Sequence, residues 1–402
     1  MYNPNIVGGG FPNTPGYNGY GGWSGGPQAY QSYGNGQTYY GHNGAPPSQP
    51  YQTYPSRSPM QPYYQQTNIP QSGYTPQSYG GATKMWSNPS IRPVSNFNPN
   101  IDAEVLRKAM KGFGCNKSKV INALCTRSNW QRQDIARAFK VMYGKDLAHE
   151  LKSELHGDFE HLILALMEPP ACYDAMQLHK AMAGLGTKES VLIEVMTTRT
   201  NAQIQEIKMA YRHLYGRELE HDLIGDTSGH FKRLLVSLCV GGRDESNHTD
   251  PIGANQDARS LYHAGEQRLG TDESRFNAIL VSRNMFQLRM IFDEYQKITG
   301  HGIEKAIENE FSGDIKDGLL AIVKSIRYRP AYFAELLHKS MKGFGTRDND
   351  LIRLIVTRSE IDLRDIKQSY HQLYKNSLEN AISGDCSGAY KEGLLALVKG
   401  NY

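Results

Sequence analysis

The chain has 402 residues, of which 39% are hydrophobic and 21% are charged, and its formal net charge is +4. The sequence has no apolar run of transmembrane length, and it does not begin with a basic stretch followed by an apolar one. These features argue against an integral membrane or secreted protein and against a specific nucleic-acid binder, and they predict a cytoplasmic protein with five free cysteines.

Residues 1–95 are predicted to be a disordered low-complexity tail. They hold 13 of the 25 tyrosines and 14 of the 19 prolines, and their only charged side chains are Arg57, Lys84 and Arg92. Such a segment lacks the aliphatic residues needed to offset the entropy of ordering. Its uncharged, tyrosine-rich composition favours weak self-association. The stretch Gln49–Pro55 is a candidate motif for an EF-hand protein partner, although most strings of this kind are only linkers.

A glycine motif followed at a fixed distance by an acidic residue recurs through the rest of the chain. Three copies read Met-x-Gly-x-Gly, and the acidic residue comes 44 positions after the Met; the altered copy begins with Glu. The four sets are Met110, Gly112, Gly114 and Glu154; Met182, Gly184, Gly186 and Asp226; Glu266, Arg268, Gly270 and Glu310; and Met341, Gly343, Gly345 and Asp385.

Other positions recur in the same register without gaps, which identifies an internal repeat. Each copy has an arginine 17 positions after its first residue, and apolar residues at positions 53, 54, 56 and 57. The apolar spacing is that of one buried stripe on a helix. We therefore predict repeats over residues 96–167, 168–240, 252–327 and 328–402, with a polar linker over 241–251.

Each repeat is predicted to contain five helices, so the fold class is all-α. In the first repeat the first expected helix covers about 102–111, and the second runs through Asn122 to about 127. The third covers about 130–142 and the fourth 146–155, and the fifth helix carries the apolar stripe. Tyr143-Gly144 is expected to end the third helix, and Gly157 the fourth. Thr187, Thr271 and Thr346 follow the loops and are predicted helix N-caps, whereas Cys115 predicts a weaker cap in the first repeat.

The glycine loop is suited to binding Ca²⁺. Glycines permit backbone angles that turn carbonyls inward, and Ca²⁺ takes about six to eight oxygen ligands in flexible geometry. The carbonyls of Met110, Gly112 and Gly114 with a bidentate Glu154 supply about five ligands. Water or a lipid phosphate would complete the shell, so the site is expected to bind Ca²⁺ weakly alone and better with an anionic ligand.

Each of these features also has a plainer interpretation. A single Gly-x-Gly between helices is usually only a turn, and it is the fourfold register that favours a cation site. The recurring arginines are interpreted as structural ion pairs. The apolar loop tips either tuck inward or face a membrane, and both alternatives remain open. The tips are Phe113, Leu185, Leu269 and Phe344.

From about residue 97 to 402 the chain resembles the annexin family. The resemblance rests on the Gly-x-Gly-Thr loop with its delayed acidic residue, and on Asp226-Thr227-Ser228-Gly229 and Asp385-Cys386-Ser387-Gly388. It implies four five-helix repeats in a curved disc, and reversible, Ca²⁺-dependent binding to acidic phospholipid membranes. It also implies that all four residue sets named above are Ca²⁺ ligands, with only the acidic members using side chains. Glu266 and Arg268 depart from the family pattern.

The sequence bears on three classes of function. The first is Ca²⁺-dependent membrane binding, with peripheral attachment when calcium rises and a role in membrane organisation, trafficking or vesicle tethering. The second is a scaffold in which the tail clusters protein partners at membranes. Deletion of residues 1–95 would distinguish the two functions, because membrane binding should survive while clustering is lost. An enzyme is not expected, because the sequence shows no nucleophile–base arrangement, phosphate-binding loop or closed zinc site.

Overall fold

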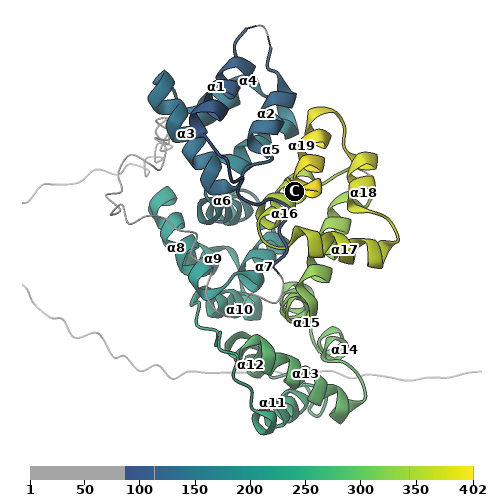
Figure 1. The fold of residues 1–402 in the computed structure, drawn as a ribbon. Coiled ribbons are helices and arrows are strands. Elements are labelled where there is room, and N and C mark those ends of the chain that lie inside the picture. Colours follow the sequence, from purple (N-terminus) through teal and green to yellow (C-terminus); the bar gives the residue numbers. More distant parts are fainter. Residues whose placement is uncertain (1–86, 113, 344, 402) are drawn as a thin grey trace, which may run out of the picture. The chain divides into compact units, whose positions relative to one another are not determined.

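The computed structural model describes residues 87–112, 114–343 and 345–401, and these residues belong to one compact unit. Across these ranges the regular secondary structure is helical throughout (Figure 1). Among the described helices, none is both long enough and apolar enough to cross a bilayer. Most of the predicted tail, with its proposed EF-hand motif, lies outside the described residues.

The first repeat contains the five predicted helices. They are α1 (Pro99–Ala109), α2 (Lys117–Leu124), α3 (Asn129–Tyr143), α4 (Leu147–Glu154) and α5 (Gly157–Met167). Helix α1 begins earlier than predicted because Asn98 caps it through its side chain and Pro99 fits the first helical position. Gly144 ends α3 in the left-handed region, as predicted.

One boundary prediction was wrong. Gly157 does not end α4, because that helix stops at Glu154. Gly157 instead opens α5 with a φ of 66°. This positive φ, which glycine adopts without strain, lets the chain reverse between the two helices.

The second repeat consists of α6 (Pro170–Met182), α7 (Glu189–Thr198), α8 (Asn201–Tyr215), α9 (Leu219–Asp226) and α10 (Gly229–Cys239). The third consists of α11 (Pro251–Ala264), α12 (Glu273–Ser282), α13 (Met285–Thr299), α14 (Ile303–Glu310) and the first part of α15 (Gly313–Met341). The fourth takes the second part of α15, then α16 (Asp348–Ser359), α17 (Leu363–Tyr374), α18 (Leu378–Asp385) and α19 (Gly388–Lys399).

Helix α15 joins two predicted helices across a kink. Tyr328 has extended angles, φ −156° and ψ 90°, within α15, and Pro330 follows two residues later. Proline lacks a backbone N–H, so Pro330 cannot donate the hydrogen bond that a continuous helix requires at this position, and the kink lies just before it. Counting the two halves separately gives five helices in the third and fourth repeats as well.

The recurring apolar stripe forms the core. Ile163, Leu235, Leu319 and Leu394 occupy the same repeat position, and each is at most 1% exposed. Within a repeat the first helix packs on the third, as α1 does on α3 and α6 on α8. Between repeats, α5 packs against α16 and α19, whereas α10 packs against α12 and α15 (Figure 1). The first repeat therefore pairs with the fourth, and the second with the third.

The fifth helices of paired repeats cross where one of them carries a glycine. A Cβ on Gly393 of α19 would lie 2.8 Å from Cδ2 of Leu162 on α5. A Cβ on Gly318 of α15 would lie 2.7 Å from Cδ2 of Leu234 on α10. Both leucines are fully buried. The two equivalent glycines thus allow a close helix approach that alanine would obstruct.

We expect Gly393→Val to lower the free energy of unfolding by about 1–3 kcal/mol, because it overpacks this crossing. Gly225→Ala is the matched control: Gly225 lies within α9, has no positive φ, and no atom lies within 4 Å of an added Cβ. That change should stabilise slightly by reducing the entropy of the unfolded chain. Urea unfolding of both variants, followed by circular dichroism, checks the prediction. Equal stability of the two would contradict it.

The recurring arginines are structural, as interpreted. Each forms a bidentate ion pair with an aspartate. The shorter of the two N–O distances in each pair lies between 2.6 and 2.8 Å. The pairs are Arg127–Asp102, Arg199–Asp174, Arg283–Asp257 and Arg358–Asp362. In the fourth repeat the partner comes from the following turn, and the Arg358 guanidinium lies over the Phe333 ring, 4.3 Å from its centre.

The segment before α1 ties the first repeat to the fourth. The amides of Ser90 and Ile91 donate to the carbonyl of Ser359, at 2.8 and 3.0 Å. The Ser90 hydroxyl donates to the carbonyl of Leu397, at 2.6 Å. Near the other end of the chain, the Asn401 amide group donates to the carbonyls of Arg92 and Thr126. These contacts fix residues 88–94 against the folded repeats.

Candidate functional site

In three of the four glycine loops the two glycines have the same φ angles. The first glycines, Gly112, Gly184 and Gly343, have φ values of 115°, 119° and 115°. The second glycines, at 114, 186 and 345, have φ values of 86°, 85° and 85°. No atom lies within 4 Å of a Cβ built on any of them. Glycine is therefore required here for its backbone angles rather than for lack of space.

The same three loops are closed by one hydrogen bond. The amide two residues after the second glycine donates to a carbonyl in the last turn of the preceding helix. The bonds are Asn116 to Ala109 (2.8 Å), Lys188 to Ala181 (2.9 Å) and Arg347 to Ser340 (2.8 Å). The methionines at the loop entrances, Met110, Met182 and Met341, are buried. Each loop is thus anchored in the core by its Met and held together at its base.

The predicted acidic ligands lie at equivalent places in all four repeats. Glu154, Asp226, Glu310 and Asp385 are each the last residue of the fourth helix in their repeat. The threonine that follows each of three loops contacts the acidic residue of the same repeat. Thr187 donates to the carbonyl of Asp226 (3.2 Å), Thr271 to Oε2 of Glu310 (2.7 Å), and Thr346 to Oδ2 of Asp385 (3.2 Å). In these three repeats the loop and the acidic residue therefore meet, although the acidic residue comes 44 positions after the first residue of the motif.

The prediction that these threonines cap the next helices was wrong. The N-cap is one residue later, at Lys188, Asp272 and Arg347. In the first repeat Asn116 is the N-cap, and its side chain accepts from the amide of Lys119, so that cap is not weak. The physical reason is that the threonine hydroxyl is used to hold the carboxylate residue instead of the helix end.

In the first repeat Cys115 takes the place of the threonine. Burial and the nearby Glu154 carboxylate raise the pKa of the Cys115 thiol. Glu154, like the acidic residues of the other repeats, is the last residue of the fourth helix. Among the described residues, no group of three or more His, Cys, Asp or Glu side chains is arranged to hold a metal. Each loop instead combines one carboxylate with backbone carbonyls.

The third loop has a different conformation. Arg268 stands at the first glycine position, and Lys375 is the sole described non-glycine residue with a positive φ, so Arg268 does not adopt the angles of Gly112. The amide of Asp272 donates to the carbonyl of Ala264 (2.7 Å). The turn that this hydrogen bond closes is one residue longer than the equivalent turn in the other three loops. The backbone of this loop therefore does not present its carbonyls as the other three do.

Glu266, which replaces the first Met of the motif, makes contacts of its own. Its carboxylate accepts from the Tyr295 hydroxyl at 2.6 Å, and lies 3.0 Å from Nε2 of His301. Burial and the hydrogen bond to Glu266 raise the pKa of Tyr295. These contacts hold the start of the third loop against α13.

Two of the four loop tips lie in the described part of the chain, and both face outward. Leu185 and Leu269 are fully exposed, at 109% and 104% of the reference area. Phe113 and Phe344 lie outside the described residues. A large apolar side chain fully in water at the tip of a loop is typical of a surface that contacts a membrane or a partner. The flanking Lys111, Arg268 and Lys342 are exposed as well.

The residues of the first, second and fourth loops fit a hard cation. Glycine conformations free the carbonyls, the base of each loop is fixed, and one carboxylate lies beside it. Ca²⁺ accepts such a set, because it takes mixed carbonyl and carboxylate oxygens with tolerant geometry. Mg²⁺ fits less well, since it requires compact octahedral coordination.

The four repeats match a known protein family. The annexin family model matches residues 101–166, 173–238, 256–322 and 332–397. Human annexin A11 is 50% identical over 319 residues, and human annexin A7 is 52% identical over 309 residues; these matches cover 79% and 77% of this chain. The chain matches 63% of the length of each of these two relatives. Bovine annexin A4 is 50% identical over 312 residues, which are 78% of this chain and 98% of that protein.

Solved structures show the same fold. Annexin III aligns with a TM-score of 0.77 and 45% identity, over 79% of this chain and 99% of its own. Chicken annexin V aligns with a TM-score of 0.74 and 46% identity, over 78% and 100% of the two chains. A calcium-bound annexin (Sm)1 aligns with a TM-score of 0.72 and 35% identity, over 79% and 94%. With four matched repeats and these relatives, the chain belongs to the annexin family, whose members are known as Ca²⁺-dependent phospholipid-binding proteins.

Proposed function

We propose that this protein binds acidic phospholipid membranes reversibly when Ca²⁺ bridges its loops to lipid phosphates. The observation that carries the proposal is the threefold repetition of one loop geometry, each time beside a carboxylate that ends the fourth helix. The proposed ligands are the carbonyls of residues 110, 112 and 114, of 182, 184 and 186, and of 341, 343 and 345, with Glu154, Asp226 and Asp385.

An incomplete coordination shell explains why calcium and lipid should depend on each other. Three carbonyls and one bidentate carboxylate supply about five oxygens, fewer than Ca²⁺ prefers. A lipid phosphate can provide the remaining oxygens and neutralise the excess positive charge. The apolar tips add a further contact, because Leu185 is positioned to enter the interfacial region of the bilayer. Several weak sites then act together through avidity.

For the third loop we propose a weaker or differently built site. Its predicted ligands are Glu266, Arg268, Gly270 and Glu310. Glu310 lies beside the loop, but the backbone does not match the other three and Glu266 is engaged by Tyr295 and His301. Binding of Ca²⁺ there in the common geometry requires this loop to rearrange, which lowers its affinity.

A calcium titration of vesicle binding at several phosphatidylserine contents tests the proposal. We expect the calcium concentration for half-maximal pelleting to fall as the phosphatidylserine content rises, because linkage makes the two ligands raise each other's affinity. Chelator should release the protein completely. Pelleting that is equal in chelator and in calcium would refute the proposal.

Cytoplasmic localisation, attachment to membranes on a calcium rise, and a role in trafficking or tethering are proposed as consequences of this activity. The scaffold function of the tail, its self-association and an EF-hand partner remain predictions from composition, because residues 1–86 lie outside the described part of the chain.

A further inference from the structure

The first glycine loop carries an excess of positive charge that the other three loops lack. The nine residues after the first position of each motif cover the loop and the first turn of the next helix. In the first repeat, residues 111–119 hold three lysines and no acidic residue, so their formal charge is +3. In residues 183–191, 267–275 and 342–350 the basic and acidic residues are equal in number, so each segment is neutral. The excess is therefore particular to the first repeat.

The charged groups of these three lysines make no contact that serves the fold. Lys111, Lys117 and Lys119, here called the first-loop lysines, are all exposed. In the described part of the chain, no ion pair and no side-chain hydrogen bond involves any of them. Their three ammonium groups are thus available to a ligand outside the protein.

Two of the lysines stand where a helix favours the opposite charge. Helix α2 begins at Lys117 and has no acidic residue in its first turn, whereas α7, α12 and α16 each have at least one there. The dipole of a helix disfavours positive charge at its N-terminus. The cap of α2 comes from Asn116, so the lysines are not needed to start the helix. Residues that oppose the local helix and contact nothing in the fold point to an external partner.

We propose that the first-loop lysines bind the phosphates of an acidic bilayer directly, without a bridging cation. This inference rests on the proposed function, because the loops are what bring lipid headgroups to this end of the repeat. Lys111 precedes the loop directly and Lys117 comes three residues after Gly114, so the lysines flank the loop on both sides. A lysine ammonium group forms charge-assisted hydrogen bonds with phosphate. Each lysine beside an acidic bilayer strengthens binding about fivefold, and three together about a hundredfold.

Replacing the three first-loop lysines together by glutamine tests this contact. Phosphatidylserine vesicles are titrated at about 0.15 M salt and at a calcium concentration where binding of the unmodified chain can be measured. The binding constant of the glutamine variant should be lower by about a hundredfold. Replacing the same three lysines by arginine keeps the charge and should preserve binding.

A matched control separates a local contact from the loss of net charge. Lys140, Lys305 and Lys399 are exposed lysines outside the glycine loops, and replacing them by glutamine lowers the formal net charge from +4 to +1, as the first change does. Binding of this control variant should fall by less than about threefold, because salt screens charges that lie away from the bilayer.

Urea unfolding of the glutamine variant shows whether the lysines serve the fold. We expect no loss of stability, because a neutral residue suits the start of α2 better than a lysine does. A loss of stability would overturn the proposal, since it would assign the lysines to the folded structure.

Binding without calcium distinguishes this proposal from the proposed calcium sites. In chelator at about 0.01 M salt, where the Debye length is about 30 Å, the unmodified chain and the control variant should pellet with phosphatidylserine vesicles. The glutamine variant should not. At about 0.15 M salt screening weakens these contacts, so release in chelator is still expected. Equal binding of the glutamine and control variants in both assays would overturn the proposal and leave the calcium sites standing. A loss confined to the glutamine variant in chelator supports it even if calcium has no effect on pelleting.

Discussion

Replacing Glu154, Asp226 and Asp385 together by alanine will abolish Ca²⁺-dependent pelleting with phosphatidylserine vesicles at calcium concentrations that pellet the unmodified chain fully. Each change removes the one carboxylate beside a loop, and three carbonyls alone provide neither the charge nor the number of oxygens that Ca²⁺ requires. Because avidity multiplies the separate sites, losing three should shift half-maximal pelleting by well over about tenfold in calcium.

The charge of this variant makes the result unambiguous. Removing three acidic residues raises the formal net charge from +4 to +7, which by simple attraction would strengthen binding to an acidic bilayer. A loss of pelleting can then be attributed only to loss of the bridging cation. Retained calcium-dependent pelleting would refute the assignment of the loops.

The third repeat provides an internal comparison for the same experiment. Glu310→Ala should shift the calcium requirement less than Asp226→Ala, because the third loop does not share the common backbone geometry and Glu266 is held by Tyr295 and His301. Glu308→Ala, an exposed change on the same helix, controls for the loss of a charge. An equal effect of Glu310→Ala and Asp226→Ala would show that the third loop adopts the common geometry when calcium binds.

Glu194→Ala will lower the free energy of unfolding by about 3–5 kcal/mol, the largest effect on stability that we expect from a single change. Glu194 on α7 accepts from the guanidinium of Arg353 on α16 at 2.8 and 2.9 Å, and the two side chains are 1% and 4% exposed. Burial alone would lower the pKa of Arg353, but the carboxylates of Glu194 and Asp350 outweigh it and raise that pKa. Alanine at 194 would leave the arginine buried with Asp350 as its remaining acidic partner.

A double replacement distinguishes an unpaired buried charge from lost packing. Glu194→Leu combined with Arg353→Met removes both charges at similar volume, and we expect a stability close to that of the unmodified chain. Asp350 retains Arg347 as a partner at 3.3 Å and is partly exposed, so it does not become a second buried charge. Urea unfolding of the single and double variants gives the comparison. If the double variant were as unstable as Glu194→Ala, packing rather than charge would be responsible.

The local features of this protein follow from short stretches of its sequence. The apolar stripe predicted the fifth helix of each repeat, and Gly144 predicted the end of α3, because helix periodicity and left-handed glycine caps are local properties. The register of glycines and acidic residues located all four loops. The unusual backbone angles of the loop glycines could be predicted because backbone conformation at glycine depends little on distant residues.

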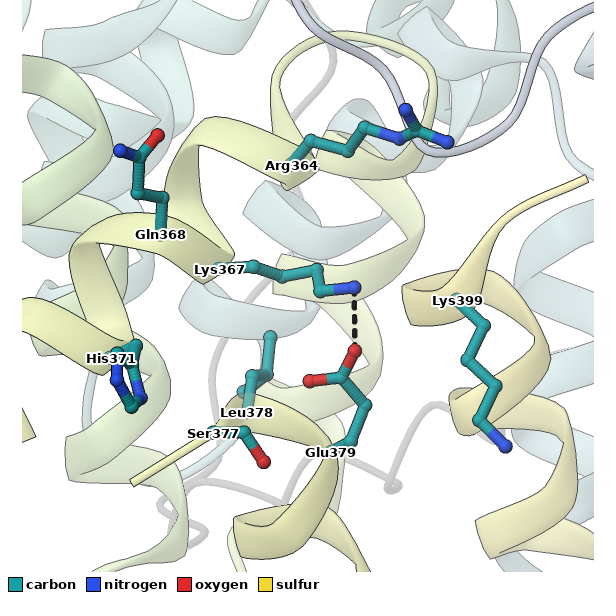
Figure 2. Close-up of a pocket in the computed structure, with 8 residues that line it drawn as sticks. All are labelled: Arg364, Lys367, Gln368, His371, Ser377, Leu378, Glu379 and Lys399. Atoms are coloured by element: carbon teal, nitrogen blue, oxygen red, sulfur yellow. Dashed lines mark ion pairs between the residues drawn. The ribbon is translucent and has the colours of Figure 1, made fainter. Parts of the chain in front are cut away.

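Other features depend on which segments meet, and sequence patterns do not contain that information. The threonines were predicted as caps because their neighbours in sequence form a helix, yet their hydroxyls bond to residues 39 positions away. The third loop encloses one extra residue and its Glu266 is held by α13. The Glu194–Arg353 pair joins residues 159 positions apart, and the open depression between α17, the start of α18 and the end of α19 is formed by three helices together (Figure 2). The sequence by itself thus determined the repeats, the helices and the position of each loop, because these follow from local backbone preferences. Only the tertiary structure decided which hydroxyl, carboxylate or guanidinium lies beside which, because those contacts depend on how the helices pack.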